Sequence, residues 1–129
     1  AKLLPVMGGT FMQAPSELSL VHLYPIDGAV HSVGSGETAW SCRDATWSMV
    51  IAAIDPDPAK ADELKRWGRS YWEAVSQHTT GGGYVNFMMG DEGDARLKAT
   101  YGDNFARLAQ VKRKYDPNNV FRVNQNIKP

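Results

Sequence analysis

The stretch from residue 61 to residue 75 constrains the fold more than any other part of the sequence. Apolar side chains recur there every three or four residues, and charged side chains occupy the positions between them. That spacing gathers the apolar residues on one face and predicts an amphipathic helix that packs on another layer. Asp57 followed by Pro58 is typical of a helix start, because the carboxylate can accept a backbone N–H and proline suits the first helical position. The apolar positions are Ala61, Leu64, Trp67, Gly68, Tyr71 and Val75.

Four short stretches rich in apolar and β-branched residues predict strands around this helix. They are residues 18–24, 29–33, 46–54 and 84–88. The Asp27-Gly28 pair between the first two predicts a hairpin. Two more helices are predicted, one ending near Ala99 and one over residues 103–115. Strands with hairpin signals, without regular alternation of strand and helix, favour an α+β fold in which helices cover one face of a small antiparallel sheet.

A chain of 129 residues is long enough for one domain with a core that needs no disulfide. Residues 1–15 contain two prolines and a Gly-Gly pair, so we predict an N-terminal loop there. Because the sequence opens on Ala1 without a methionine, we interpret this loop as a mid-domain start of a fragment. Residues 16–129 are predicted to form a single domain that ends in an extended docking tail over 116–129. A sheet this small has an exposed edge, through which a homodimer could form.

The charge balance and the composition argue against nucleic acid and membranes as partners. Lys and Arg number 14, and Asp and Glu also number 14, so there is no basic excess to favour nucleic acid or an acidic membrane surface. The longest apolar run, residues 49–54, is far shorter than the roughly 20 residues that span a bilayer. The one cysteine, Cys42, rules out an internal disulfide and agrees with a reducing compartment, so we expect a cytoplasmic location.

Most individual residues that could carry chemistry are better explained structurally. The histidines lack a second ligand at metal spacing, and neither glycine cluster is followed by the residues that a phosphate loop needs. Cys42 lacks a neighbouring base and is interpreted as an inert thiol. The four tryptophans could line an apolar ligand pocket, although core packing is favoured. They are Trp40, Trp47, Trp67 and Trp72.

Two stretches resist a purely structural explanation. On the predicted strand over residues 84–88, Tyr84 and Asn86 share one face, so two hydrogen-bonding side chains inside an apolar strand require partners. The tail over residues 116–127 is extended and rich in amide side chains, which indicates that it docks on a surface.

These same stretches resemble the C-terminal segment of berberine-bridge-enzyme-like, FAD-linked oxidases of the bacterial type. Tyr84-Val85-Asn86-Phe87 is similar to the family's Tyr-x-Asn-Tyr/Phe element, and residues 101–108 resemble its Tyr-Gly-x-Asn-Tyr-x-Arg-Leu helix entry. Residues 114–121 and 124–127 resemble its closing Lys-Tyr-Asp-Pro and Asn-Gln-x-Ile elements. Further upstream, four elements are similar to bacterial members as well, which extends the resemblance over residues 16–129. They are Asp27-Gly28-Ala29-Val30, Thr38-Ala39-Trp40, Cys42-Arg43 and the helix over residues 67–72.

The resemblance implies an oxidoreductase that passes a hydride from a small-molecule alcohol or amine to FAD, which O2 then reoxidises. It implies that Tyr84, Asn86 and Phe87 contact substrate and that Asn124, Gln125 and Asn126 contact the flavin or its domain. The FAD-binding domain of the same or a companion polypeptide would be the partner, and this chain would be inactive alone.

The base is an open question under this resemblance. Family members that oxidise hydroxyls commonly use the last tyrosine of the motif as base, and this chain has Phe87 there. Another group could serve, the substrate could be an amine that needs no base, or the base could lie outside this chain. The alternative function is a homodimeric, non-enzymatic module that binds an apolar ligand in a tryptophan-lined cavity.

Overall fold

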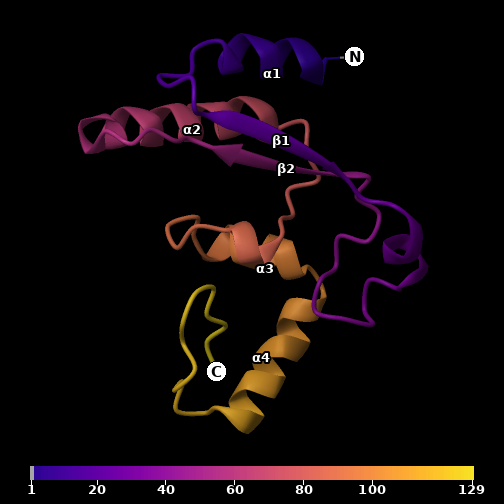
Figure 1. Cartoon of the computed structure of the whole chain (residues 1–129). Coiled ribbons are helices and arrows are strands. Elements are labelled where there is room, and N and C mark those ends of the chain that lie inside the picture. The colour runs from indigo at the N-terminus through magenta and orange to yellow at the C-terminus, as the bar shows by residue number, and fades with distance from the viewer. Residues whose placement is uncertain (1) are drawn as a thin grey trace. The chain divides into compact units, whose positions relative to one another are not determined.

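A computed structural model describes residues 2–129 (Figure 1). Their contacts fall into two compact units. The first unit combines the residues up to Pro25 with Trp47–Thr80, and the second combines Ile26–Thr46 with Gly81–Pro129. The chain therefore leaves the first unit, returns to it, and ends in the second.

The predicted amphipathic helix is confirmed in the first unit as α2, Ala61–Ser76. Its buried residues are Leu64, Trp67, Tyr71 and Val75, which repeat at three- and four-residue spacing and form one face. The predicted start is also confirmed. The Asp57 carboxylate accepts the backbone N–H of Ala59 at 2.9 Å, at the entry to a short 3-10 helix η2, Pro58–Lys60, that leads into α2.

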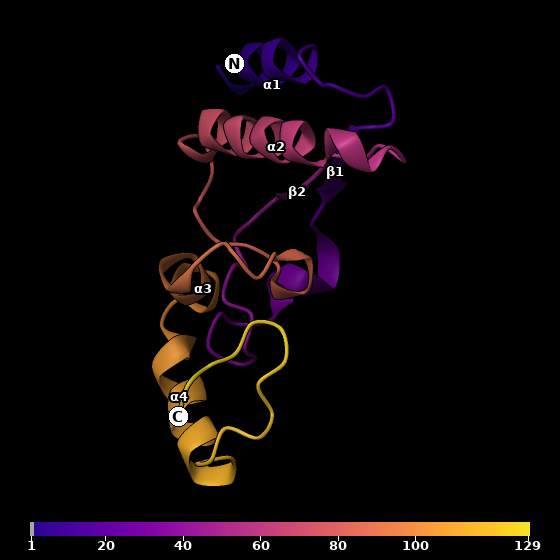
Figure 2. The same ribbon diagram turned by 90° about the vertical axis from the view of Figure 1, so that its left-hand side faces the viewer.

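The α+β fold class is confirmed in the same unit. Strands β1, Leu20–Pro25, and β2, Trp47–Ala52, form an antiparallel pair in which Leu20 lies opposite Ala52 and Pro25 opposite Trp47. In both views α2 runs between the strand pair and the N-terminal helix (Figures 1 and 2). The core is formed by Trp67, Tyr71 and Val75, against which side chains of the sheet such as Val21 and Ile51 pack.

The predicted N-terminal loop is wrong, because Leu3–Phe11 forms helix α1. Glycine and proline lower the helix propensity of this stretch, but packing on α2 outweighs that preference. Leu3, Val6 and Met7 pack against the core. The Thr10 carbonyl at the end of α1 accepts the indole N–H of Trp67 at 3.1 Å.

The second unit contains helices α3, Asp94–Tyr101, and α4, Asn104–Tyr115, where the sequence predicted helices. It also contains two short 3-10 helices, η1, Gly28–Ser32, and η3, Val85–Phe87. Residues 116–129 contain no helix or strand and run beside α4 in both views (Figures 1 and 2).

Two predicted strands are wrong, because η1 replaces the one over 29–33 and η3 replaces the one over 84–88. The expected hairpin is absent from the described residues, since β1 pairs with β2 across the longer segment 26–46. A lone strand needs a neighbour for its N–H and C=O groups. In η3 a backbone hydrogen bond within the turn replaces the bond to a neighbouring strand, because the N–H of Phe87 donates to the carbonyl of Tyr84 at 2.9 Å.

Candidate functional site

The turn formed by η3 brings together the three residues that the sequence assigned to substrate. The Asn86 side-chain amide donates a hydrogen bond to the phenolic oxygen of Tyr84 at 2.6 Å. The rings of Tyr84 and Phe87 meet edge to face, with centroids 5.2 Å apart. Tyr84 is 45% exposed and Phe87 59% exposed. The turn therefore presents a polar pair next to an apolar ring, all within reach of a ligand.

The geometry of this cluster comes from the 3-10 turn. On a strand, Tyr84 and Phe87 would point to opposite faces, because side chains alternate with a period of two. In a 3-10 helix, residues three apart lie above one another, which places the two rings in contact. The sequence indicated that Tyr84 and Asn86 need hydrogen-bond partners, and on this turn they bond to each other.

Residues that follow the turn hold it in place. The Glu92 carboxylate accepts the backbone N–H of Met89 at 2.7 Å and also pairs with Arg96 of α3. On the other side of the turn, the indole N–H of Trp40 donates to the carbonyl of Gly83 at 3.3 Å. Both ends of the turn are thus tied to other segments of the second unit.

The tail begins at a compact charged anchor around Asp116. Its carboxylate accepts the backbone N–H groups of Val120 at 2.7 Å and Phe121 at 3.0 Å. The Lys112 ammonium group donates to this carboxylate and to the carbonyl of Phe121. Lys112 and then these backbone hydrogen bonds hold the pKa of Asp116 below its usual range, because all of them favour the charged carboxylate.

The three residues that the sequence assigned to the cofactor form a tight turn near the end of the tail. The N–H of Asn126 donates to the carbonyl of Asn124 at 3.0 Å, with Gln125 between them. Asn124 adopts a φ of 61°, a left-handed conformation that asparagine tolerates better than most residues. Asn124 is exposed, and the Asn126 side-chain oxygen is buried with no hydrogen-bond partner among the described residues.

Gln125 connects this tail turn to η3. Its side-chain amide donates to the carbonyl oxygens of Met88 at 3.0 Å and Met89 at 3.1 Å. The Gln125 side chain therefore joins two segments that are almost forty residues apart. One carries the residues assigned to substrate, and the other carries those assigned to cofactor.

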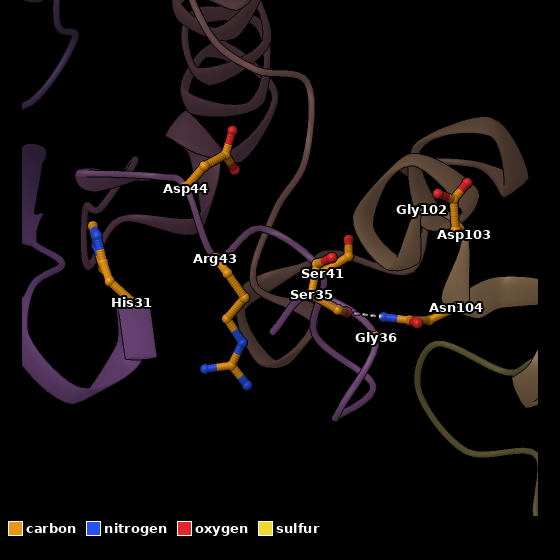
Figure 3. A pocket seen from close by; sticks show the side chains of 9 residues that line it. All are labelled: His31, Ser35, Gly36, Ser41, Arg43, Asp44, Gly102, Asp103 and Asn104. Carbon is orange, nitrogen blue, oxygen red and sulfur yellow. Dashed lines mark hydrogen bonds between the residues drawn. The ribbon is translucent and has the colours of Figure 1, made fainter. Parts of the chain in front are cut away.

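A polar hollow of about 800 Å³ lies elsewhere in the second unit (Figure 3). Asn104, the first residue of α4, donates to the carbonyls of Ser35 at 2.6 Å and Thr38 at 3.0 Å, which fixes one wall. The Arg43 guanidinium lies over the Trp40 ring, 4.9 Å from its centroid. Figure 3 shows this guanidinium pointing away from Asp44, so the charged groups do not converge on one point.

Sequence reasoning did not single out this hollow. The only signal was that Arg43 and Asn104 lie in stretches that are similar to the family, Cys42-Arg43 and residues 101–108. Within residues 2–129, no three His, Cys, Asp or Glu side chains are grouped so as to hold a metal ion. In the same range, no helix is long and apolar enough to cross a membrane.

Trp47 and Trp67 lie in different surroundings. Trp67 belongs to the core of the first unit, and Trp47 is 61% exposed on β2. Neither the polar hollow nor a smaller one beside α4 has a tryptophan in its wall.

The Tyr-x-Asn turn, the helices α3 and α4 and the amide-rich tail that returns to the turn all lie in one continuous stretch of the chain. Residues 83–128 match the family described as "Berberine and berberine like" and belong to it.

Relatives and solved structures agree with this family. The chain is 32% identical over 120 residues to the FAD-linked oxidoreductase YgaK of Bacillus subtilis (strain 168), covering 90% of this chain and 25% of the relative. It is 29% identical to the aclacinomycin-N/aclacinomycin-A oxidase of Streptomyces galilaeus, covering 84% and 23%. The structure of Physcomitrella patens BBE-like 1 superposes with a TM-score of 0.85 at 26% identity, covering 98% and 26%. The chain spans about a quarter of the length of these relatives.

Proposed function

We propose that this chain forms the substrate-side and C-terminal portion of an FAD-dependent oxidase that removes hydride from an alcohol or amine carbon of a small molecule. The observation that carries the proposal is the convergence of Tyr84, Asn86 and Phe87 in one exposed turn, with a 2.6 Å hydrogen bond and a 5.2 Å ring contact. The relatives named as FAD-linked oxidoreductases support the same class of reaction.

Each residue of the turn has a distinct part in contacting substrate. The Asn86 amide donates to the oxygen of Tyr84, which leaves the phenolic hydrogen of Tyr84 available to a polar group of the substrate. The Phe87 ring offers an apolar surface beside that hydroxyl. Because Phe87 cannot accept a proton, the base is another group, the substrate is an amine that needs none, or the base lies outside this chain.

The tail turn is proposed to face the cofactor. The exposed side chain of Asn124 offers hydrogen-bonding groups of the kind that the polar edge of a flavin requires. We propose that Asn124, Gln125 and Asn126 contact the flavin or the domain that holds it. FAD would supply the hydride acceptor, which O2 would reoxidise.

The partner under this proposal is an FAD-binding domain, in the same polypeptide or in a companion. The isolated 129 residues would then be inactive, and the protein would act in the cytoplasm. Pairing of two copies through a free edge of the β1–β2 sheet is a further proposed contact, since each strand has one neighbour among the described residues.

The first test uses the protein as expressed from its gene. Its intact mass and its visible absorption are measured before and after denaturation, and a flavin spectrum is expected. Tyr84→Phe is then compared with Tyr115→Phe, a matched change at a tyrosine that is 73% exposed on α4. Flavin reduction by a panel of alcohols and amines should slow at least tenfold in the first variant only. A protein that binds no flavin even when FAD is added would contradict the proposal.

A further inference from the structure

The side chain of Gln125 makes two hydrogen bonds within the chain that the proposed function does not explain. Its amide nitrogen has two hydrogens, and it donates to the carbonyls of Met88 and Met89, at 3.0 and 3.1 Å. Both donors are therefore used inside the chain. Gln125 is half-buried, in contrast to the exposed Asn124 beside it. The amide nitrogen of Gln125 thus faces the turn that carries the substrate residues.

The two carbonyls that receive this amide belong to the exit of the η3 turn. Met88 directly follows η3, and its N–H donates to the carbonyl of Val85 at 3.3 Å. The N–H of Met89 is held by the Glu92 carboxylate at 2.7 Å, while the carbonyl of Met89 accepts the N–H of Glu92 at 3.4 Å. Local contacts thus satisfy the N–H groups of Met88 and Met89, and the Gln125 amide donates hydrogen bonds to their carbonyls.

The tail is fixed on its other side as well. The Asp116 carboxylate binds the N–H groups of Val120 and Phe121, and Lys112 links that carboxylate to the carbonyl of Phe121. Gln125 follows Phe121 by four residues. The tail is therefore attached at Asp116, at the end of α4, and again at Gln125, on the η3 turn.

We infer that Gln125 is a positioning residue, which fixes the turn carrying Tyr84, Asn86 and Phe87 relative to the tail turn formed by residues 124–126. Substrate contacts and flavin contacts would then keep one spacing, set by the N–H groups that the Gln125 side chain donates to the η3 turn. The assignment of those two turns to substrate and flavin rests on the proposed function. The connection between them rests on the two hydrogen bonds of Gln125 alone.

The test replaces Gln125 by its isosteric acid. Gln125→Glu keeps the shape but replaces the two N–H donors with a carboxylate, which would face two carbonyl oxygens and repel them. Gln110→Glu makes the same change of charge at an exposed position of α4 and is the control. Gln125→Lys, which retains N–H donors on a longer side chain, tests for rescue. The protein expressed from its gene is used throughout.

Hydrogen exchange over residues 84–92 is the first readout, and exchange over 61–76 in the other unit is the reference. We expect about tenfold faster exchange over 84–92 in Gln125→Glu, at least partial recovery in Gln125→Lys, and no change in Gln110→Glu. Unchanged exchange over 84–92 in Gln125→Glu would overturn the inference. If Gln125→Glu does not fold, Gln125→Lys tests the inference instead. Its hydrogen exchange over residues 84–92 must then stay within a few-fold of that of the unmodified protein, and a larger increase would overturn the inference.

Visible circular dichroism of the bound flavin is the second readout, since a general loss of stability would not shift it in folded protein. We expect a changed flavin signal in Gln125→Glu and an unchanged one in Gln110→Glu. A flavin signal that does not respond while exchange over 84–92 increases would overturn the shared spacing of the two turns. Absence of flavin in every variant would overturn the proposed function, and the exchange readout would still decide the role of Gln125.

Discussion

Asn86 holds the phenol of Tyr84 through a 2.6 Å hydrogen bond between side chains two residues apart. The same turn places the Tyr84 ring edge to face with Phe87. A hydroxyl group added to the Phe87 ring would therefore enter a site that already contains an oriented phenol and an amide. The family resemblance also implies that position 87 is where members that oxidise hydroxyls commonly carry their base.

Phe87→Tyr is accordingly expected to increase oxidation of alcohols by the flavin-loaded protein. A positioned general base contributes roughly 10²- to 10⁴-fold, so a gain of at least tenfold in flavin reduction by alcohols is expected. Phe121→Tyr adds the same hydroxyl at a phenylalanine that is 80% exposed in the tail and serves as control. Equal rates for both variants would mean that position 87 does not face the reacting carbon.

Asp55 should make the stability of the first unit dependent on pH. The Lys60 ammonium group, the N–H of Asp57 and the Ser16 hydroxyl lower the pKa of Asp55 to about 2. An unfolded chain has an aspartate pKa of about 3.9, so this contribution is complete above that value and is lost as the pH falls toward 2. Urea unfolding should show Asp55→Asn to be less stable than the unmodified protein at pH 7, with a smaller difference at pH 3. A difference that does not depend on pH would contradict this origin.

Gly82 lies where any larger side chain would collide with Cys42. A Cβ atom at position 82 would be 2.3 Å from the Cys42 sulfur, far inside contact distance. Gly82→Ala should therefore destabilise the protein by about 1–3 kcal/mol, the usual cost of overpacking. Combining it with Cys42→Ala removes the sulfur and should restore most of that loss, as measured by denaturant unfolding of the double-mutant cycle. Strictly additive losses would show that the sulfur is not the obstacle.

Val75 is fully buried in the core cluster, against which side chains of α1 and the sheet pack. Val75→Ala removes two methyl groups and leaves a cavity, so a loss of about 2 kcal/mol in the free energy of unfolding is expected. Arg66→Ala, on the exposed side of the same helix, should change it by no more than about 0.5 kcal/mol. Similar losses for both variants would mean that α2 does not bury the face described above.

The elements that the sequence predicted correctly are those whose own residues determine them. The helix at Ala61–Ser76 has a one-sided apolar pattern, and the strand at Trp47–Ala52 is β-branched and apolar. Helix α1 was missed because its stability comes from packing on Trp67 in a distant segment, against its local propensity. The strands predicted over 29–33 and 84–88 failed because the pattern of a short apolar run cannot reveal whether a neighbouring strand exists.

In the candidate site too, the sequence predicted the residue types but not the contacts between distant segments. The residue types at Tyr84, Asn86 and Phe87 could be identified from the motif alone, but the ring contact depends on a 3-10 turn that the pattern did not reveal. The contact of Gln125 with Met88 and Met89 joins segments nearly forty residues apart. No local pattern encodes such a contact, because it depends on the path that α3, α4 and the tail follow between them.

The two-unit arrangement has a consequence for how pieces of this protein can be produced. The family segment at residues 83–128 looks like a natural unit for expression, yet its helices depend on the loop that precedes β2. Ser41 donates to the carbonyl of Thr100 at 3.1 Å, and Asn104 binds the carbonyls of Ser35 and Thr38. A truncation that starts at residue 83 removes these partners, and α4 then loses the contacts that hold its first turn. Soluble expression of the family segment should therefore require residues 26–46, supplied in the same chain or as a separate peptide.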